Sequence, residues 1–124
     1  MPRVIHFEIA VDEPRRAIDF YAAVFGWKVD KWEGPEDYWL VTTGDKSQPG
    51  IDGAFSRRTQ MFPPTTNVID VPSVDDHLAK INSNGGETIV PKSTIPGVGY
   101  VAYFKDTEGN ILGIFQGDLS ADKS

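Results

Sequence analysis

The stretch VIHFEIAV at residues 4–11 decides the predicted fold, because its pattern returns as TNVIDV at residues 66–71. One side of the first stretch is apolar throughout, with Ile5, Phe7, Ile9 and Val11. The other side carries His6 and Glu8, since alternate residues of an extended chain point to opposite faces. We therefore predict a β-strand with one dry face and one face that carries two polar groups.

A helix and three more strand candidates follow this first strand. Asp12 offers an N-cap, and apolar residues at helical spacing predict a helix over residues 15–25 that ends at Gly26. The apolar stripe of this helix consists of Ala17, Tyr21, Val24 and Phe25. The next strands are expected over residues 28–32, 38–43 and 51–56.

The same order of elements begins again after Pro63-Pro64, which cannot donate to a strand ladder. Ser73 is expected to cap a second helix that ends at Asn84-Gly85-Gly86, and residues 106–110 are expected to form a hairpin turn. The predicted strands cover residues 66–71, 87–90, 100–105 and 111–116. The polar residues 117–124 are expected to be frayed.

Matching positions of the two halves indicate a duplication. An offset of 60 pairs Val11 with Val71, Gly26 with Gly86, Val29 with Ile89, and Gly53 with Gly113. Coincidence is the alternative, because βα units often share glycine stops, but four matches in one register favour duplication. We expect one domain over residues 1–124, with modules at about 3–58 and 64–117 and a polar tail at 118–124.

Composition excludes several classes of protein. The net charge of the 124 residues is −6 and no Lys/Arg cluster occurs, which argues against a nucleic-acid partner. No apolar run approaches the roughly 20 residues of a membrane span, so we expect no membrane partner. Without cysteine there is no disulfide or thiolate site. The N-terminus lacks a signal-peptide stretch, and the cytoplasm is expected by elimination.

Several segments together resemble the vicinal oxygen chelate superfamily of glyoxalases, bleomycin-resistance proteins and extradiol dioxygenases. The segments are VIHFEI at 4–9, AIDFY at 17–21, VFGW at 24–27, NGGE at 84–87 and FKDTEGN at 104–110. The last stretch is similar to the family's Asp-Pro-x-Gly-Asn turn, with Thr107 in place of proline. The resemblance covers about residues 4–116 and is strongest to the glyoxalase-related branch of mostly unassigned activity.

The resemblance implies an α+β fold of two tandem βαβββ modules. Their strands would form a curved, half-barrel mixed sheet with the helices on the convex face, which leaves His6 and Glu8 for the cavity. It also implies a small-molecule ligand and a homodimer, in which modules pair within one chain or across two chains.

The resemblance also identifies four positions where metal-using relatives place ligands. Here they carry His6, Gly53, Thr66 and Gly113, and Asp52 is expected to point to the opposite face. One imidazole is too few for tight binding of a transition metal. We therefore expect no metal or other cofactor, although a divalent metal is the alternative. Metal-dependent lactoylglutathione lyase activity is disfavoured.

His6 and Glu8 are the candidate catalytic residues, since two residues apart on a strand they can form an acid–base pair. The alternative is a hydrogen-bonded cavity histidine beside a partly solvated carboxylate. His77 is expected on the second helix, outside the cavity.

Gly53, Thr66, Gly113 and Tyr38 are the candidate cavity residues. The two glycines would leave room for a ligand or, alternatively, mark close packing. Either Tyr38 or Trp39 faces the cavity, but not both. The loops at 44–50 and 91–99 are rims of the cavity or ordinary hairpin loops.

The sequence leaves three functions open. The first is a metal-free enzyme of lyase or isomerase type that uses His6 and Glu8. The second is a protein that sequesters a small molecule without catalysis, as bleomycin-resistance proteins do. The third is an accessory module whose cavity is filled by its own side chains.

Overall fold

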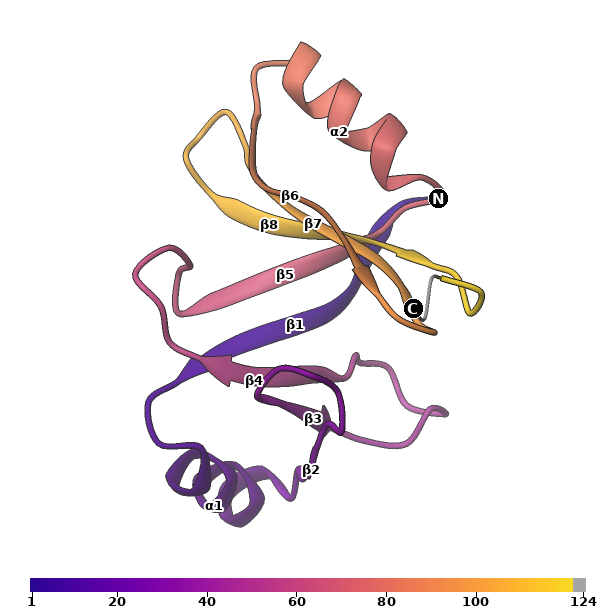
Figure 1. Cartoon of the computed structure of the whole chain (residues 1–124). Helices are drawn as coiled ribbons and strands as arrows, with labels where there is room; N and C mark the ends of the chain where they lie inside the picture. The colour runs from indigo at the N-terminus through magenta and orange to yellow at the C-terminus, as the bar shows by residue number, and fades with distance from the viewer. Residues whose placement is uncertain (122–124) are drawn as a thin grey trace. The chain divides into compact units, whose positions relative to one another are not determined.

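The computed structural model describes residues 1–121, which form two compact units. The first unit is Ile5–Thr66, and the second combines Met1–Val4 with the chain from Asn67 onward. Each unit contains one helix and a mixed four-stranded sheet in the order βαβββ (Figure 1). This confirms the α+β class and the order of elements predicted from the sequence. None of the helices in residues 1–121 is long and apolar enough to cross a membrane.

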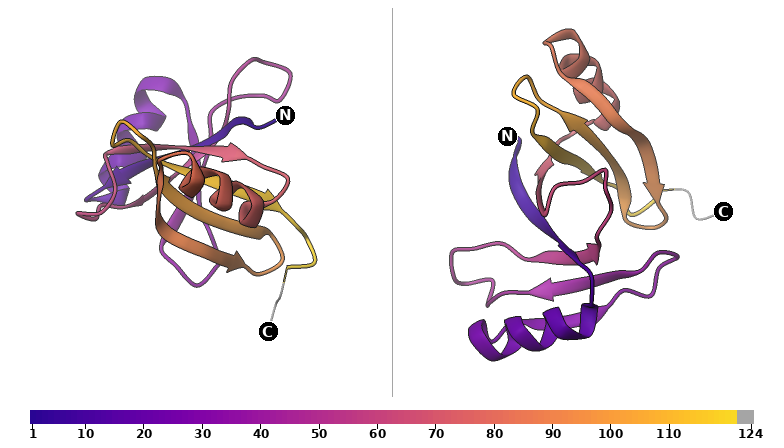
Figure 2. Two further views of the ribbon diagram at one scale, coloured as in Figure 1. Left: turned by 90° about the horizontal axis from the view of Figure 1, so that it is seen from above. Right: turned by 90° about the vertical axis from the view of Figure 1, so that its left-hand side faces the viewer.

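The first unit holds the first five elements of the chain, except for the first two residues of β1. They are β1 (Arg3–Val11), α1 (Pro14–Phe25), β2 (Lys28–Lys31), β3 (Tyr38–Thr42) and β4 (Gly53–Arg57). Its strands lie in the order β2-β3-β4-β1, with β1 parallel to β4 and the other pairs antiparallel. The helix α1 covers one face of this sheet (Figure 2).

The core of the first unit lies between α1 and the sheet. Val11, Trp39, Val41 and Phe55 are its buried residues. Tyr21 of α1 stacks on Trp27 with ring centroids 4.9 Å apart and an interplanar angle of 7°. Aromatic pairs of this kind stabilise the packing beyond the area that they bury.

Two expectations for α1 need correction. The N-cap is Glu13 and not Asp12, whose carboxylate accepts a hydrogen bond from Arg58 Nε at 3.0 Å instead. The predicted apolar stripe is also too wide, because Val24 and Phe25 are 56% and 60% exposed. Only the side of α1 that carries Ala17 and Tyr21 packs against the sheet.

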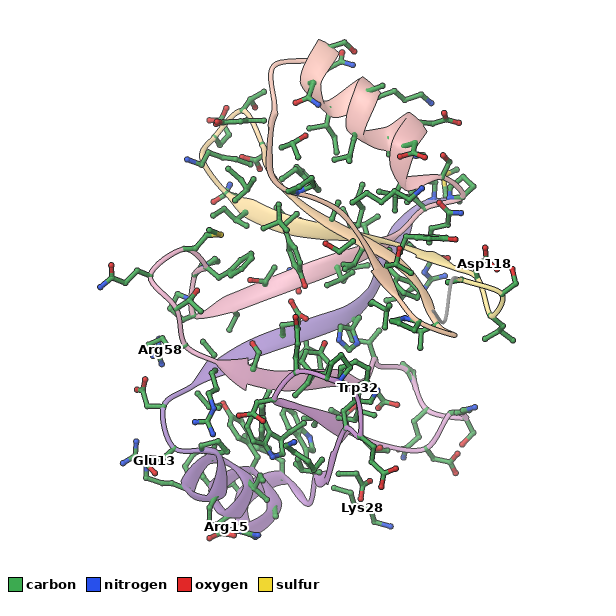
Figure 3. All side chains as sticks on the ribbon, viewed as in Figure 1. Glu13, Arg15, Lys28, Trp32, Arg58 and Asp118 are labelled. Atoms are coloured by element: carbon green, nitrogen blue, oxygen red, sulfur yellow. The ribbon has the colours of Figure 1, made fainter. Side chains whose placement is uncertain are left out.

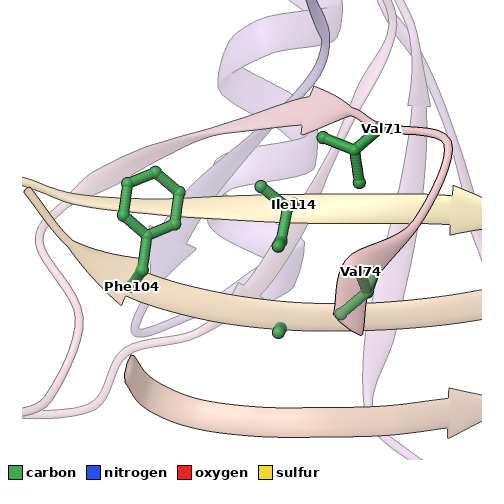
Figure 4. Close-up of a cluster of buried hydrophobic side chains, with 5 residues drawn as sticks. Val71, Val74, Phe104 and Ile114 are labelled. Atoms are coloured by element: carbon green, nitrogen blue, oxygen red, sulfur yellow. The ribbon is translucent and has the colours of Figure 1, made fainter. Parts of the chain in front are cut away.

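The second unit repeats this arrangement. Its elements are β5 (Thr65–Asp70), α2 (Val74–Ser83), β6 (Glu87–Ile95), β7 (Gly99–Lys105) and β8 (Ile111–Gly117). The first two residues of β5 belong to the first unit. The strands lie in the order β5-β8-β7-β6, with β5 parallel to β8. Its core residues are Val71, Val74, Ala102, Phe104 and Ile114 (Figure 4).

Two local predictions for the second unit are confirmed. The hydroxyl of Ser73 accepts a hydrogen bond from the backbone N–H of Asp76 at 3.1 Å and so caps α2. In the turn between β7 and β8, the carboxylate of Asp106 accepts hydrogen bonds from the N–H groups of Glu108 and Asn110. These bonds hold the pKa of Asp106 below its usual value.

Residues 91–99 are not the loop that their Gly and Pro content predicts, because β6 continues to Ile95. The strand lies at the edge of its sheet, and one of two irregularities in its pairing with β7, between Val90 and Ser93, contains Pro91. An edge strand with bulges tolerates a residue that cannot donate a hydrogen bond. The expected fraying of the tail is wrong for Ala121, which is 1% exposed. Residues 122–124 lie outside the described residues.

Gly53 and Gly113 are not counterparts, in contrast to the offset that pairs them in the sequence. Ile9 of β1 pairs with Phe55 of β4, and its counterpart Ile69 of β5 pairs with Ile114 of β8. Ala54 is therefore the counterpart of Gly113. The second unit has one residue fewer than the first unit between its first and its last strand. A shift of one residue turns a side chain to the opposite face of the sheet, so Gly53 and Gly113 face opposite sides.

Both glycines allow close packing, on different faces. Gly53 pairs with Phe7, and a Cβ at this position would clash with the Phe7 ring on the side of α1. Gly113 pairs with Val68, and its Cβ would lie 2.9 Å from the ring of Tyr103. The geometry supports the packing interpretation for these glycines.

We expect Gly53→Ala to lower the free energy of unfolding by about 1–3 kcal/mol, because the methyl group overpacks the core at Phe7. Urea denaturation at neutral pH measures this change. The matched control is Gly44→Ala in the exposed loop, where the methyl group meets only the flexible end of Gln48 and costs less than about 0.5 kcal/mol. Equal stability of the two variants would contradict the packing role.

Candidate active site

Three side chains of the first unit form a continuous hydrogen-bond chain. The Nε2 atom of His6 lies 2.8 Å from the hydroxyl of Tyr38, and this hydroxyl donates to Oε2 of Glu8 at 2.8 Å. The rings of His6 and Tyr38 are nearly parallel, with an interplanar angle of 23°. All three side chains are partly buried. These three side chains are the hydrogen-bond chain of the site.

The strand registers explain why these residues meet. Tyr38 lies on β3 and the other two on β1, with β4 between them. The distance from β3 to β1 is two strand spacings, roughly 9–10 Å. A tyrosine side chain reaches that far only if the side chains of the strand between them are small. On this face β4 carries Ala54, which pairs with Glu8, and Ser56, which pairs with Tyr38. These small residues let the tyrosine reach across the middle strand.

The hydrogen-bond chain fixes the tautomer of a neutral His6. The hydroxyl of Tyr38 has one hydrogen, which it donates to Glu8, so its oxygen accepts the Nε2–H of His6. Nδ1 is then the unprotonated nitrogen. Within residues 1–121, Nδ1 has no hydrogen-bond partner and retains solvent contact. The arrangement therefore presents a basic nitrogen to a ligand.

The electrostatic surroundings of His6 act in opposite directions. Burial lowers the pKa of His6 below its usual 6.5, because a charged imidazole loses its hydration. The negative charges of Glu8 and Asp52 act to raise the pKa, but burial is the larger effect. His6 is therefore neutral at pH 7, as a general base must be.

The structure corrects the predicted orientation of Asp52. We expected it to point away from His6, yet it is close enough for its charge to act on the imidazole. Its Oδ1 accepts hydrogen bonds from the backbone N–H of Thr43 at 2.8 Å and from the Thr43 hydroxyl at 3.2 Å. The same registers that place Gly53 beside Phe7 put residue 52 on the side of His6.

The other candidate residues divide between the two units. Tyr38 lies on the face of His6, while Trp39 is in the core beside α1. Thr66 is buried in the first unit, and Gly113 belongs to the second. Trp32, which Figure 3 labels, is not among the predicted site residues. Its ring meets that of Tyr38 edge-on with centroids 6.0 Å apart. Its place at the end of the strand predicted over residues 28–32 is the signal in the sequence.

The residues present do not fit the metal site that the superfamily implies. Among residues 1–121, no three His, Cys, Asp or Glu side chains converge as metal ligands. Nε2 of His6 is occupied by Tyr38, and Asp52 is held by Thr43. His77 lies on α2, where its Nδ1 contacts the carbonyl oxygen of Ser73 at 3.0 Å. The described residues therefore lack the donor set of that metal site.

Comparison with known proteins gives one family. The model of the Glyoxalase/Bleomycin resistance protein/Dioxygenase superfamily matches residues 3–114. No curated protein matches the sequence.

Solved structures of the same fold include methylmalonyl-CoA epimerases. A variant of the Streptomyces coelicolor enzyme in complex with 2-nitronate-propionyl-CoA is 16% identical, with a TM-score of 0.69 and 97% of each chain covered. The Mycobacterium tuberculosis epimerase is 12% identical, with a TM-score of 0.67 over 93% of this chain and 87% of that one. A hypothetical protein from Bacillus halodurans is 15% identical, with a TM-score of 0.67 over 98% and 99%.

We expect Glu8→Gln to lower the pKa of His6 below its value in the unaltered protein. The amide still accepts the bond from Tyr38 but removes the negative charge that raises the pKa. Titration of the imidazole signals by NMR measures the change. Glu13→Gln, the same charge change at the exposed N-cap of α1, should leave the His6 pKa in place. An unchanged pKa in Glu8→Gln would contradict the geometry.

The lowered pKa of His6 also makes stability depend on pH. Between its native pKa and 6.5 the unfolded chain binds more protons than the folded one, so stability falls as pH decreases through this window. His6→Gln should flatten this part of the stability profile, which urea denaturation measures between about pH 5 and 7. Profiles of equal slope would show that His6 is not held neutral by burial.

Proposed function

Because the chain belongs to the Glyoxalase/Bleomycin resistance protein/Dioxygenase superfamily, we propose that it binds a small organic molecule beside His6 and transfers a proton on it without a metal ion. The observation that carries the proposal is the hydrogen-bond chain, which holds a neutral imidazole with its basic Nδ1 open. The reaction class is isomerisation, or elimination by a lyase, that begins with removal of a proton.

His6 is the base in this proposal. Its Nδ1 removes a proton from a C–H bond beside a carbonyl group of the ligand. The electron pair of that bond forms a carbon–carbon double bond, and the π pair of the carbonyl moves to its oxygen. The imidazolium formed keeps its Nε2–H bond to Tyr38. Return of the proton from Nδ1 to another atom of the ligand completes an isomerisation.

Tyr38 and Glu8 stabilise the charge that the imidazolium gains. Tyr38 orients the ring through Nε2, and Glu8 supplies a negative charge through the tyrosine hydroxyl. This is the role that a carboxylate plays behind a catalytic histidine in a nucleophilic triad, with a tyrosine interposed. Asp52 adds a second negative charge near the ring.

Thioesters are the first ligand class to examine, because the structural neighbours include epimerases of an acyl-CoA. We expect the protein to catalyse exchange of the α-hydrogens of a propionyl or 3-phenylpropionyl thioester of N-acetylcysteamine with D2O. Loss of the α-proton signal in NMR measures the rate. His6→Gln should remove the catalysed exchange, a loss of at least about 100-fold for a general base.

Two further variants and one control test whether Glu8 and Tyr38 support the imidazolium. Glu8→Gln and Tyr38→Phe should slow exchange by roughly tenfold or more, because they weaken support of the imidazolium. Glu13→Gln is the control, since it makes the same charge change at an exposed position. A thioester that binds but does not exchange faster than in buffer would refute catalysis and favour sequestration. Equal rates in His6→Gln and the unaltered protein would also refute it.

A further inference from the structure

Two apolar side chains, Trp32 and Leu40, form an apolar wall beside the hydrogen-bond chain, on the same face of the first unit. The backbone N–H of Trp32 donates to the carbonyl oxygen of Tyr38 at 2.8 Å, which extends the β2–β3 ladder by one pair. Residues directly opposite in an antiparallel ladder project to the same face. The Trp32 ring therefore lies on the His6 face and not in the core, and it meets the Tyr38 ring at 76°.

Gly34 holds the Trp32 ring in this position. A Cβ at residue 34 would collide with three carbons of the indole ring, so the ring lies directly on the glycine backbone. Any larger residue at position 34 would push the ring away. The loop after β2 thus fixes the orientation of an aromatic side chain that is only partly buried.

Leu40 of β3 is the second residue of the apolar wall. It lies two residues from Tyr38 and is 41% exposed, although both of its neighbours, Trp39 and Val41, are buried in the core. A strand in a folded sheet usually places a polar residue at such a position. Trp32 and Leu40 therefore present apolar surface beside the polar hydrogen-bond chain.

We propose that Trp32 and Leu40 determine substrate specificity by binding an uncharged apolar group, such as a phenyl ring, that the ligand carries beside its reacting carbonyl. The inference rests on the proposed function, because it assigns the non-reacting part of the same ligand. Ligand sites combine such apolar walls with a few polar groups that fix orientation. Aromatic rings gain additional stabilisation from edge-to-face or offset contacts with tryptophan.

The test compares binding of the propionyl and 3-phenylpropionyl thioesters of N-acetylcysteamine. The two probes have the same thioester, and the phenyl ring is the added group. Ligand-observed NMR titration gives both dissociation constants in the unaltered protein and in every variant. Labelling of the unaltered protein with 5-fluorotryptophan shows whether the Trp32 signal moves. We expect the phenyl-bearing probe to bind roughly tenfold more tightly, a preference of the size that one buried aromatic contact supplies.

Trp32→Ala and Leu40→Ala should each reduce this preference to less than about threefold, because they remove parts of the apolar contact. Glu33→Ala, an exposed neighbour in the same loop, is the matched control and should keep the full preference. The titration of His6 by NMR shows that each variant retains the folded site. Gly34→Ala should displace the ring and reduce the preference as well.

The binding test is separate from the test of catalysis. In His6→Gln the preference for the phenyl-bearing probe should persist, even though proton exchange is lost. If the unaltered protein does not prefer that probe, or if Trp32→Ala keeps the preference, the specificity proposal is overturned whatever the exchange rates show. If exchange fails but the preference holds, only the proposed catalysis is overturned.

Discussion

The two-residue period of the strands is the constraint on which the first unit depends. On β1 it turns Phe7, Ile9 and Val11 toward α1 and leaves His6 and Glu8 on the opposite face. Burial of the apolar side chains is the main stabilising contribution of such a core. A shift of one residue would place His6 and Glu8 under α1, at the cost of burying two polar groups. The burial that stabilises the fold therefore also positions the site.

Both units use an aromatic side chain of their third strand to cover a small residue of their fourth. In the second unit the ring of Tyr103 lies over Gly113, next to Val68 of β5. In the first unit Tyr38 crosses β4, where Ala54 and Ser56 are small, and finds the polar residues of β1. The counterparts of His6 and Glu8 on β5 are Thr66 and Val68, so this acid–base pair is not repeated at the matching positions of β5.

The sequence predicts the order of the elements well, because caps, glycine stops and apolar periodicity are local signals. It also predicts that His6 and Glu8 lie on one face, because their spacing of two residues on one strand is enough to place them there. It misplaces Gly53 and Asp52, since their facing depends on how β4 pairs with β1, a register that a loop length of one residue alters. Tyr38 and Trp32 depend in the same way on pairing between strands. A single sequence does not encode such contacts as a local pattern.

Tyr38, which lies between the carboxylate of Glu8 and the imidazole of His6, reconciles two opposite requirements of a general base. A base must be neutral before the reaction and must tolerate a positive charge afterwards. A carboxylate in direct contact with an imidazole favours the protonated form strongly, because the attraction grows as the distance shrinks. Tyr38 keeps Glu8 one hydrogen bond farther from His6, so burial remains the larger effect and the ring stays neutral. Once Nδ1 takes up a proton, the same hydrogen bonds align the hydroxyl dipole and the carboxylate with the new charge.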